Sequence, residues 1–135
     1  AALNTVQVTE IGPDTIMALS ERVERGEWIV IAGDRTAVGS QDRTVRAMFL
    51  GREASFAQGP YIIAALLKCP VYLLFCMRQG DGYELYVEDF ADQVTLPRQD
   101  REGAMQKHAQ QYASRLEHYV MKAPFQWYNF FNFWA

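Results

Sequence analysis

The chain has 135 residues, of which 50% are hydrophobic and 21% are charged, and its 13 basic and 16 acidic side chains give a net charge of -3. This length fits a single domain over residues 1–135, with enough apolar residues for a core. The charge balance argues against nucleic acid as a partner, which needs a basic face to neutralise phosphates. Cys69 and Cys76 lack metal-ligand spacing, so we expect reduced thiols, no metal site and no disulfide.

The first third of the chain alternates between strand and helix patterns. Thr5 to Val8 alternates as a short strand does. Gly12-Pro13-Asp14 then supplies a helix start, apolar residues recur at helical spacing from Ile16 to Val23, and Gly26 stands where a helix would end. The run Trp28-Ile29-Val30-Ile31-Ala32 is continuously apolar and predicts a strand buried on both faces.

The middle of the chain predicts a loop, a strand and a helix. Residues 33–43 are rich in glycine and charge and form a loop at the carboxyl end of the buried strand, where open α/β sheets place their ligands. Arg43 to Phe49 predicts a further strand. Pro60 precedes the apolar run Tyr61 to Leu67, which predicts a buried helix with first-turn amides available to an anion.

The last part of the chain predicts a hairpin and the longest helix. Pro70 to Met77 indicates a central strand, and Gln79-Gly80-Asp81-Gly82 is a turn signal that leads to the alternating segment Tyr83 to Val87. From Asp100, a plausible N-cap, to about Lys122 one helix face collects apolar residues, and Pro124 ends the helix. We find no repeat and no linker between domains.

Two polar segments are candidates for binding an anion. Asp34 and Arg35 directly follow the predicted buried strand, and an arginine there can bind phosphate or carboxylate through two parallel hydrogen bonds. The alternative is a surface ion pair in a polar loop. Gln58, Gly59 and Pro60 could lend amides to an anion at a helix start, or simply form a turn.

The order of these segments resembles a known enzyme superfamily. An apolar strand ending in Gly33-Asp34-Arg35 is followed by the turn Phe56-Ala57-Gln58-Gly59-Pro60 and by the strand Cys69 to Phe75. This order resembles the second, third and fourth sequence blocks of the lysophospholipid acyltransferases. The aromatic end, Gln126 to Trp134, is most similar to the lauroyl/myristoyl acyltransferases of lipid A biosynthesis. The resemblance implies the C-terminal part of a glycerolphosphate-acyltransferase-like α/β fold, a mixed, largely parallel sheet flanked by helices.

The resemblance also implies an activity and a place in the cell. Such enzymes move a fatty acyl group from acyl carrier protein or acyl-CoA to a hydroxyl of a lipid or glycolipid, without a further cofactor. They work at the cytoplasmic face of the bacterial inner membrane, which implies a peripheral location here. Asp34, Arg35 and the turn Gln58, Gly59 and Pro60 would bind the phosphate or acceptor head group. The side chains implied for the acyl groove are Phe49, Leu50, Ile62 and Ile63.

Two features depart from the superfamily pattern. Gln58 stands where the superfamily has Glu, which weakens any role that depends on a negative charge. The superfamily's base is a His with an Asp five positions later. Here His108 and His118 are followed at that distance by Ala113 and Ala123, so the chain contains no catalytic residues and we expect no transferase activity from it alone. The alternative is a non-catalytic lipid- or acyl-carrier-binding module.

The aromatic tail, residues 124–135, must be covered. Its aromatic side chains carry about 1,000 Å² or more of largely apolar area, well above what a soluble monomer usually exposes. The tail either folds back as part of the core or inserts at a membrane interface, where Trp and Tyr prefer to lie. An unpaired strand edge could also pair with the same edge of another copy, so a homo-oligomer is one alternative for this chain.

Overall fold

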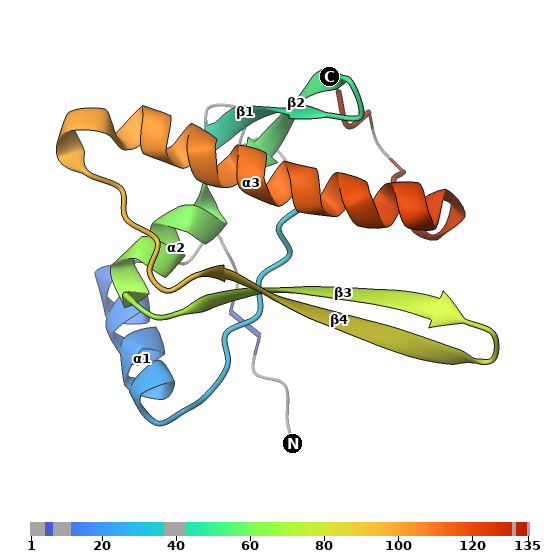
Figure 1. The fold of residues 1–135 in the computed structure, drawn as a ribbon. Helices are drawn as coiled ribbons and strands as arrows, with labels where there is room; N and C mark the ends of the chain where they lie inside the picture. The colour runs from blue at the N-terminus through green and yellow to red at the C-terminus, as the bar shows by residue number, and fades with distance from the viewer. Residues whose placement is uncertain (1–4, 7–11, 37–42, 131, 135) are drawn as a thin grey trace.

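The computed structural model describes residues 5–6, 12–36, 43–130 and 132–134. The expected strand from Thr5 to Val8 lies mostly outside this part of the chain. In chain order the described elements are α1 (Pro13–Glu24), β1 (Thr44–Phe49), β2 (Arg52–Ala57), α2 (Gly59–Leu67), β3 (Val71–Gln79), β4 (Gly82–Ala91), the 3-10 turn η3 (Arg98–Asp100), α3 (Arg101–Lys122) and the 3-10 turn η4 (Pro124–Gln126) (Figure 1).

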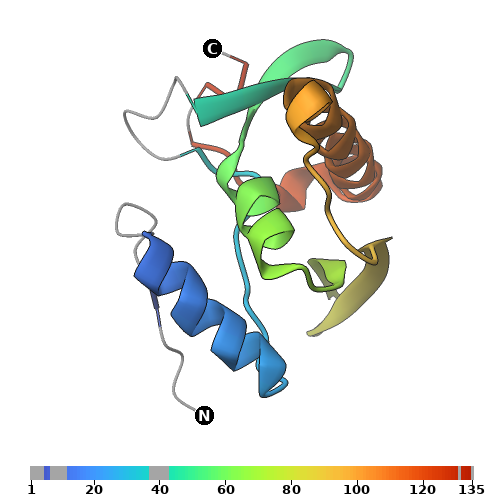
Figure 2. The same ribbon diagram turned by 90° about the vertical axis from the view of Figure 1, so that its left-hand side faces the viewer.

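The strands form two separate antiparallel hairpins. β1 pairs with β2, and β3 pairs with β4. Long helix α3 lies between the two hairpins, and α2 and α1 stand at one end of the molecule (Figures 1 and 2). The fold is mixed α/β as expected, but the expected largely parallel sheet is not present among the described residues. Short turns join β1 to β2 and β3 to β4, and such turns can connect only antiparallel neighbours.

Strand β2 was not expected, because the turn before it lacks the usual residues. Leu50 and Gly51 have φ angles of 51° and 76°, the two positive values that a two-residue hairpin turn needs. Asn or Asp normally occupies the first of these positions, since their side chains tolerate this backbone shape. Because Leu50 is not a typical turn residue, the sequence pattern did not indicate the turn. Gly51 and the alternating buried positions Ala54 and Phe56 were the signals for the turn and the strand.

The prediction of a buried strand from Trp28 to Ala32 is wrong. This segment has no strand partner among the described residues, and Trp28 and Val30 are 76% and 81% exposed. A strand buried on both faces needs neighbours on both sides, which the two closed hairpins do not supply. β3 is likewise not a central strand of the described sheets, because among the described residues it pairs with β4 alone and its side chains alternate between covered and exposed.

The three helices agree with the sequence pattern. α1 ends before Gly26, whose φ of 82° is the left-handed value expected after a helix. The Asp100 carboxylate accepts a hydrogen bond from the Gly103 amide and so caps α3. α1 packs on α2 through a small cluster of Leu19, Ile63 and Leu67.

The main core forms where α3 crosses the β1–β2 hairpin. Ala109 and Ala113 are fully buried, and their small side chains let the helix approach the strands. Phe49, at 0% exposure, and Phe56 meet edge to face at 6.1 Å between ring centroids. The aromatic tail closes this core, since Trp127 and Phe133 each lie 5.2 Å from the Phe49 ring.

The tail therefore divides into two parts. Trp127, Phe133 and Trp134 pack on the core, as the folded-back alternative requires. Phe125 and Phe130 are 93% and 91% exposed. Among the described helices none is long and apolar enough to cross a membrane.

Side-chain amides also bind the strand edges. The Gln110 side chain accepts from the Met48 N–H and donates to the Met48 carbonyl. The Gln126 amide makes the same pair of bonds with the backbone of Arg78 in β3. These contacts satisfy backbone groups that an edge strand would otherwise present to another chain.

Phe49→Ala is expected to lower the free energy of unfolding by about 3–5 kcal/mol, because it opens a cavity among the aromatic rings of the core. Phe125→Ala removes the same ring from an exposed position and should change stability by about 0.5 kcal/mol or less. Urea denaturation of both variants measures the difference. Equal losses would show that the tail does not close the core as described.

Candidate functional site

A close contact between Gly33 and helix α3 fixes the start of the predicted anion-binding loop. A Cβ atom on Gly33 would lie 2.8 Å from Cζ of Tyr112, closer than carbon atoms can approach. A side chain at residue 33 would therefore force the Tyr112 ring to move. This contact holds the loop against α3 and sets the place of Asp34 and Arg35.

The aromatic tail holds Asp34 and Arg35 from the other side. Nε1 of Trp127 donates to Oδ2 of Asp34 at 3.3 Å. Nη2 of Arg35 donates to the carbonyl oxygen of Tyr128 at 3.1 Å, and Nε of Arg35 lies 3.6 Å from Oδ1 of Asp34. The Arg35 side chain nevertheless remains 47% exposed. The loop thus presents a guanidinium that is positioned by the protein and accessible to solvent.

Two tyrosines, the buried Tyr61 and the partly buried Tyr112, connect this loop to the first turn of α2. Burial raises the pKa of Tyr112, and the nearby Asp34 carboxylate and Tyr61 raise it further, whereas Arg35 lowers it. Burial also raises the pKa of Tyr61. Both phenols therefore stay neutral over the physiological range. The influence of Asp34, Arg35 and Tyr61 on this pKa indicates that the loop and the first turn of α2 both lie near Tyr112.

The predicted turn at Gln58 mainly attaches α2 to β1. The Gln58 backbone N–H donates to the Arg43 carbonyl, and its side-chain Nε2 donates to the Thr44 carbonyl at 2.7 Å. Its own carbonyl accepts the N–H groups of Tyr61 and Ile62, and Pro60 has no N–H. The first turn of α2 is thus not the open set of amides that the sequence suggested, which leaves Gly59 as its remaining donor.

The four residues expected to line an acyl groove do not share one surface. Phe49 is fully buried among aromatic rings, and Leu50 lies in the β1–β2 turn. Ile62 packs against the main core, while Ile63 belongs to the cluster between α2 and α1. The proposal that these four side chains line an acyl groove therefore gains no support from their positions and remains a prediction.

Both histidines lie on α3 and contact aromatic rings, although His118 is exposed. The His108 ring stacks on Tyr61 at 6.4 Å and meets Phe90 at 6.0 Å, while its Nδ1 is buried without a partner among the described residues. The His118 ring lies edge-on against Tyr119 at 5.0 Å. Within the described part of the chain, no hydrogen bond or ion pair joins either ring to a carboxylate, although His118 is close enough to Glu88 to help lower the pKa of that carboxylate. Among the described residues, no group of His, Cys, Asp and Glu side chains is suited to hold a metal ion.

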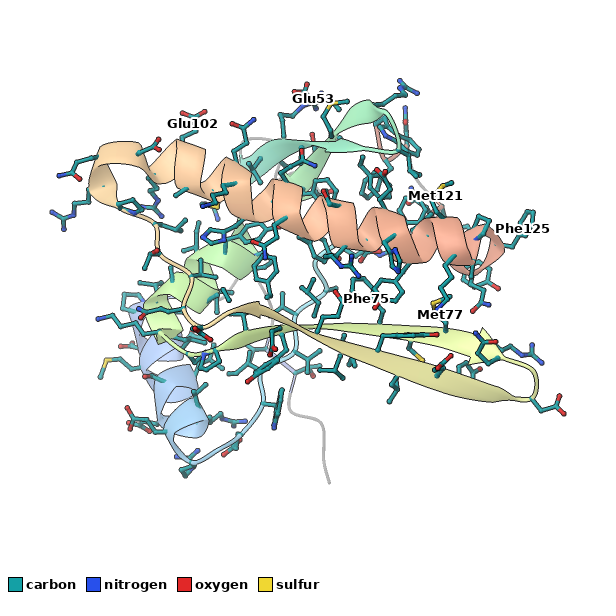
Figure 3. All side chains as sticks on the ribbon, in the orientation of Figure 1. Glu53, Phe75, Met77, Glu102, Met121 and Phe125 are labelled. Atoms are coloured by element: carbon teal, nitrogen blue, oxygen red, sulfur yellow. The ribbon has the colours of Figure 1, made fainter. Side chains whose placement is uncertain are left out.

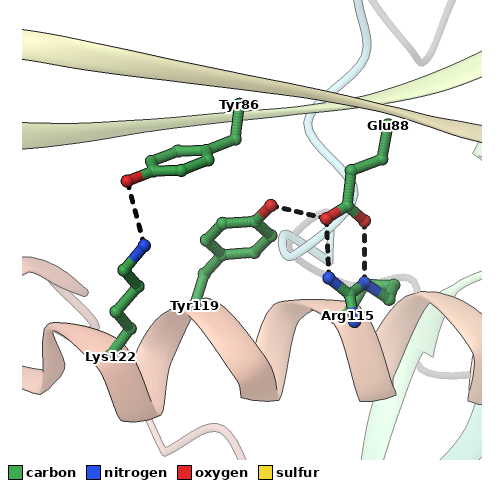
Figure 4. Close-up of polar contacts among 5 residues, drawn as sticks. All are labelled: Tyr86, Glu88, Arg115, Tyr119 and Lys122. Atoms are coloured by element: carbon green, nitrogen blue, oxygen red, sulfur yellow. Dashed lines mark hydrogen bonds and ion pairs between the residues drawn. The ribbon is translucent and has the colours of Figure 1, made fainter.

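A polar cluster joins β4 to α3 and was missed by the sequence analysis (Figure 4). Arg115 donates two hydrogen bonds to the Glu88 carboxylate, at 2.6 and 2.7 Å, and the Tyr119 hydroxyl donates a third. Lys122 donates to the Tyr86 hydroxyl at 3.0 Å. Arg115, Tyr119 and Lys122 recur at helical spacing, and Tyr86 and Glu88 share one face of β4. These two spacings, helical in α3 and alternating in β4, were the sequence signal that could have predicted the cluster.

Arg115 and Tyr119 together stabilise the charged form of Glu88. The hydrogen bonds from Arg115, and then from Tyr119, lower the pKa of Glu88 to about 2. The same contacts raise the pKa of Arg115. The cluster is a structural ion pair between a strand and a helix, and its charges are satisfied by one another.

The model of the bacterial lipid A biosynthesis acyltransferase family matches residues 6–135. The chain belongs to this family. The match bears out the resemblance that the segments around Arg35 and Gly59 indicated, and it extends over the aromatic tail. No individual protein of curated function matches the chain.

The pH dependence of stability should report the Glu88 cluster. Because the folded pKa of Glu88 lies below its ordinary value of 4.5, the ion pair stabilises the fold above about pH 4.5, and this contribution is lost as the pH falls toward 2. Glu88→Gln should lower the free energy of unfolding by about 1 kcal/mol at pH 7 and should change it little at pH 2. The expected loss is small for an ion pair because Arg115 is partly exposed to solvent.

Glu53→Gln provides the matched control, because Glu53 pairs with Arg46 on an exposed surface. It should change the free energy of unfolding by about 0.5 kcal/mol or less at either pH. Chemical denaturation from pH 7 to pH 2 measures both variants. A loss for Glu88→Gln that does not depend on pH would contradict the ion-pair assignment.

Proposed function

We propose that this chain is the acceptor-binding, C-terminal part of an acyltransferase that moves a fatty acyl group to a hydroxyl of a phosphorylated lipid or glycolipid. Membership of the lipid A biosynthesis acyltransferase family over residues 6–135 is the observation that carries the proposal. The acyl donor would be acyl carrier protein or acyl-CoA. The proposal assigns this chain substrate binding and no proton transfer, because no His in it is followed five positions later by Asp.

The proposed acceptor site centres on Arg35. Its guanidinium is half-exposed, and its contacts with Tyr128 and Asp34 fix its direction. A phosphate can accept two parallel hydrogen bonds from such a group. The Gly59 amide at the start of α2 would add a second donor for the same head group.

A non-catalytic lipid- or acyl-carrier-binding module is the second candidate. The observation that favours it is that neither His108 nor His118 has a hydrogen bond or ion pair to a carboxylate among the described residues, while both rings contact aromatic rings. A His-x-x-x-x-Asp sequence encoded in the same gene would favour the enzyme. Acyl transfer by the purified chain without such a segment would contradict both proposals.

We further propose a peripheral location at the cytoplasmic face of a bacterial inner membrane. The exposed tail side chains Phe125, Tyr128 and Phe130 support it, because exposed aromatic rings suit the interface between lipid and water. The Tyr128 and Phe130 rings stack on each other at 6.4 Å and form one small apolar projection.

Arg35→Ala should weaken binding of a phosphorylated glycolipid in detergent micelles about 10- to 100-fold, because a charge-assisted pair of hydrogen bonds is lost. Isothermal titration calorimetry of the purified chain measures this change. Arg101→Ala, at the exposed first residue of α3, is the control and should bind as the wild type does. If both variants bind alike while melting at the wild-type temperature, Arg35 is not part of the acceptor site.

Phe125→Ser combined with Phe130→Ser should reduce the fraction of protein that floats with phospholipid vesicles about tenfold, since two rings no longer enter the interface. Met17→Ser, which removes an exposed apolar side chain from α1, serves as the control. Equal flotation of all three proteins would exclude the tail as the membrane contact.

A further inference from the structure

The β3–β4 hairpin has one apolar face that nothing in the described structure covers. We call it the outer hairpin face, and its members alternate along the two strands: Tyr72, Leu74, Cys76, Tyr83, Leu85 and Val87. Leu74, Leu85 and Val87 are 57%, 63% and 62% exposed, and Tyr83 is 76% exposed. Leu74 lies opposite Val87, and Cys76 lies opposite Leu85, so the aliphatic side chains form the centre of the face.

The opposite face of the same hairpin is already used. Phe75 stacks on Tyr119 of α3 at 4.1 Å between ring centroids, and Glu88 binds Arg115. Phe75 and Met77 point toward α3, between helix and hairpin (Figure 3). Helix α3 therefore cannot cover the outer side. A two-stranded sheet with one open apolar face is marginal in water, and further apolar contacts would stabilise it.

The segment after α1 enlarges the uncovered surface. The Trp28 ring lies 5.7 Å from Tyr72, so the exposed indole borders the outer hairpin face. Using about 150–250 Å² for each aromatic side chain and about 100 Å² for each aliphatic one, the exposed surface is on the order of 700 Å². That exceeds the patch of a typical monomer and approaches the roughly 800 Å² that each partner contributes to a stable protein interface.

Charges stand at the two ends of the outer hairpin face and have opposite signs. Arg78 lies opposite Tyr83 near the hairpin turn, and Asp89 lies opposite Tyr72 at the other end. A two-fold axis across the strands would lay the turn end of one copy over the far end of the other. Arg78 of each copy then lies over Tyr72 of the second copy, and Asp89 of that copy is about one strand spacing to the side. The aliphatic centres of the two faces overlap.

From this complementarity we propose that the outer hairpin face is a dimer interface and that its occupant is a second copy of this chain. The face is self-complementary, because each copy supplies the same apolar centre and one charge of each sign at its ends. The pairing is face to face, so it does not require the strand edges that Gln110 and Gln126 already bind. It is also independent of the acyl-transfer proposal.

Leu74→Glu tests the apolar centre. Light scattering after size exclusion should give the wild type twice the 15.5 kDa mass of one chain at about 50 µM, and Leu74→Glu the mass of one chain. Leu66→Glu is the matched control, because Leu66 on α2 is 54% exposed and lies outside the face, and it should remain a dimer. Unchanged helical circular dichroism would show that all three proteins are folded.

A charge exchange tests the identity of the partner. Asp89→Arg should weaken dimerisation about tenfold, because it brings two arginines together across the interface. Adding Arg78→Asp to Asp89→Arg should restore the dimer. Such a rescue is expected only if the partner is a second copy of the chain, because the partner must then carry both changes as well. A monomeric wild type overturns the proposal, as does a dimer that Leu74→Glu leaves intact. Vesicle binding that depends on Leu74 in a monomer would instead assign the face to lipid.

Discussion

The close fit of α3 between two unlike hairpins is the constraint on which the rest of the structure depends. On one side, Ala109 and Ala113 let the helix touch β1 and the buried aromatic cluster around Phe49. On the other side, Arg115 and Tyr119 bind the carboxylate of Glu88 in β4. Apolar burial stabilises the first contact, and directed hydrogen bonds specify the second. Neither hairpin contributes much stability alone, so both depend on the helix.

The aromatic tail has a structural role in positioning the candidate site. Trp127 packs on Phe49 and donates to Asp34, and the Tyr128 carbonyl accepts from Arg35. Trp127 thus both closes the core and holds the loop. Any change that loosens the tail would lower stability and displace the guanidinium together. Functional and structural effects of substitutions in the tail are therefore coupled, whereas substitutions at exposed Phe125 affect neither the core nor the loop.

The candidate site and the outer hairpin face lie on different parts of the molecule and have different chemistry. Around Arg35 the groups are charged or phenolic, as an anionic head group requires. The outer hairpin face offers carbon surface with charges only at its ends. The two proposed roles share no side chain, so substitutions can test acceptor binding and association between copies separately.

The sequence by itself determined the three helices, their boundaries at Gly26 and Asp100 and the β3–β4 hairpin, because each depends on residues near one another in the chain. The order of its segments along the chain also indicated the family. The sequence did not determine the conformation and exposure of Trp28 to Ala32, because an apolar run carries no information on whether a neighbouring strand exists. It also could not show that Tyr112 and Trp127, remote along the chain, would enclose Asp34 and Arg35. Only tertiary packing decides such contacts, since they depend on where α3 places each side chain.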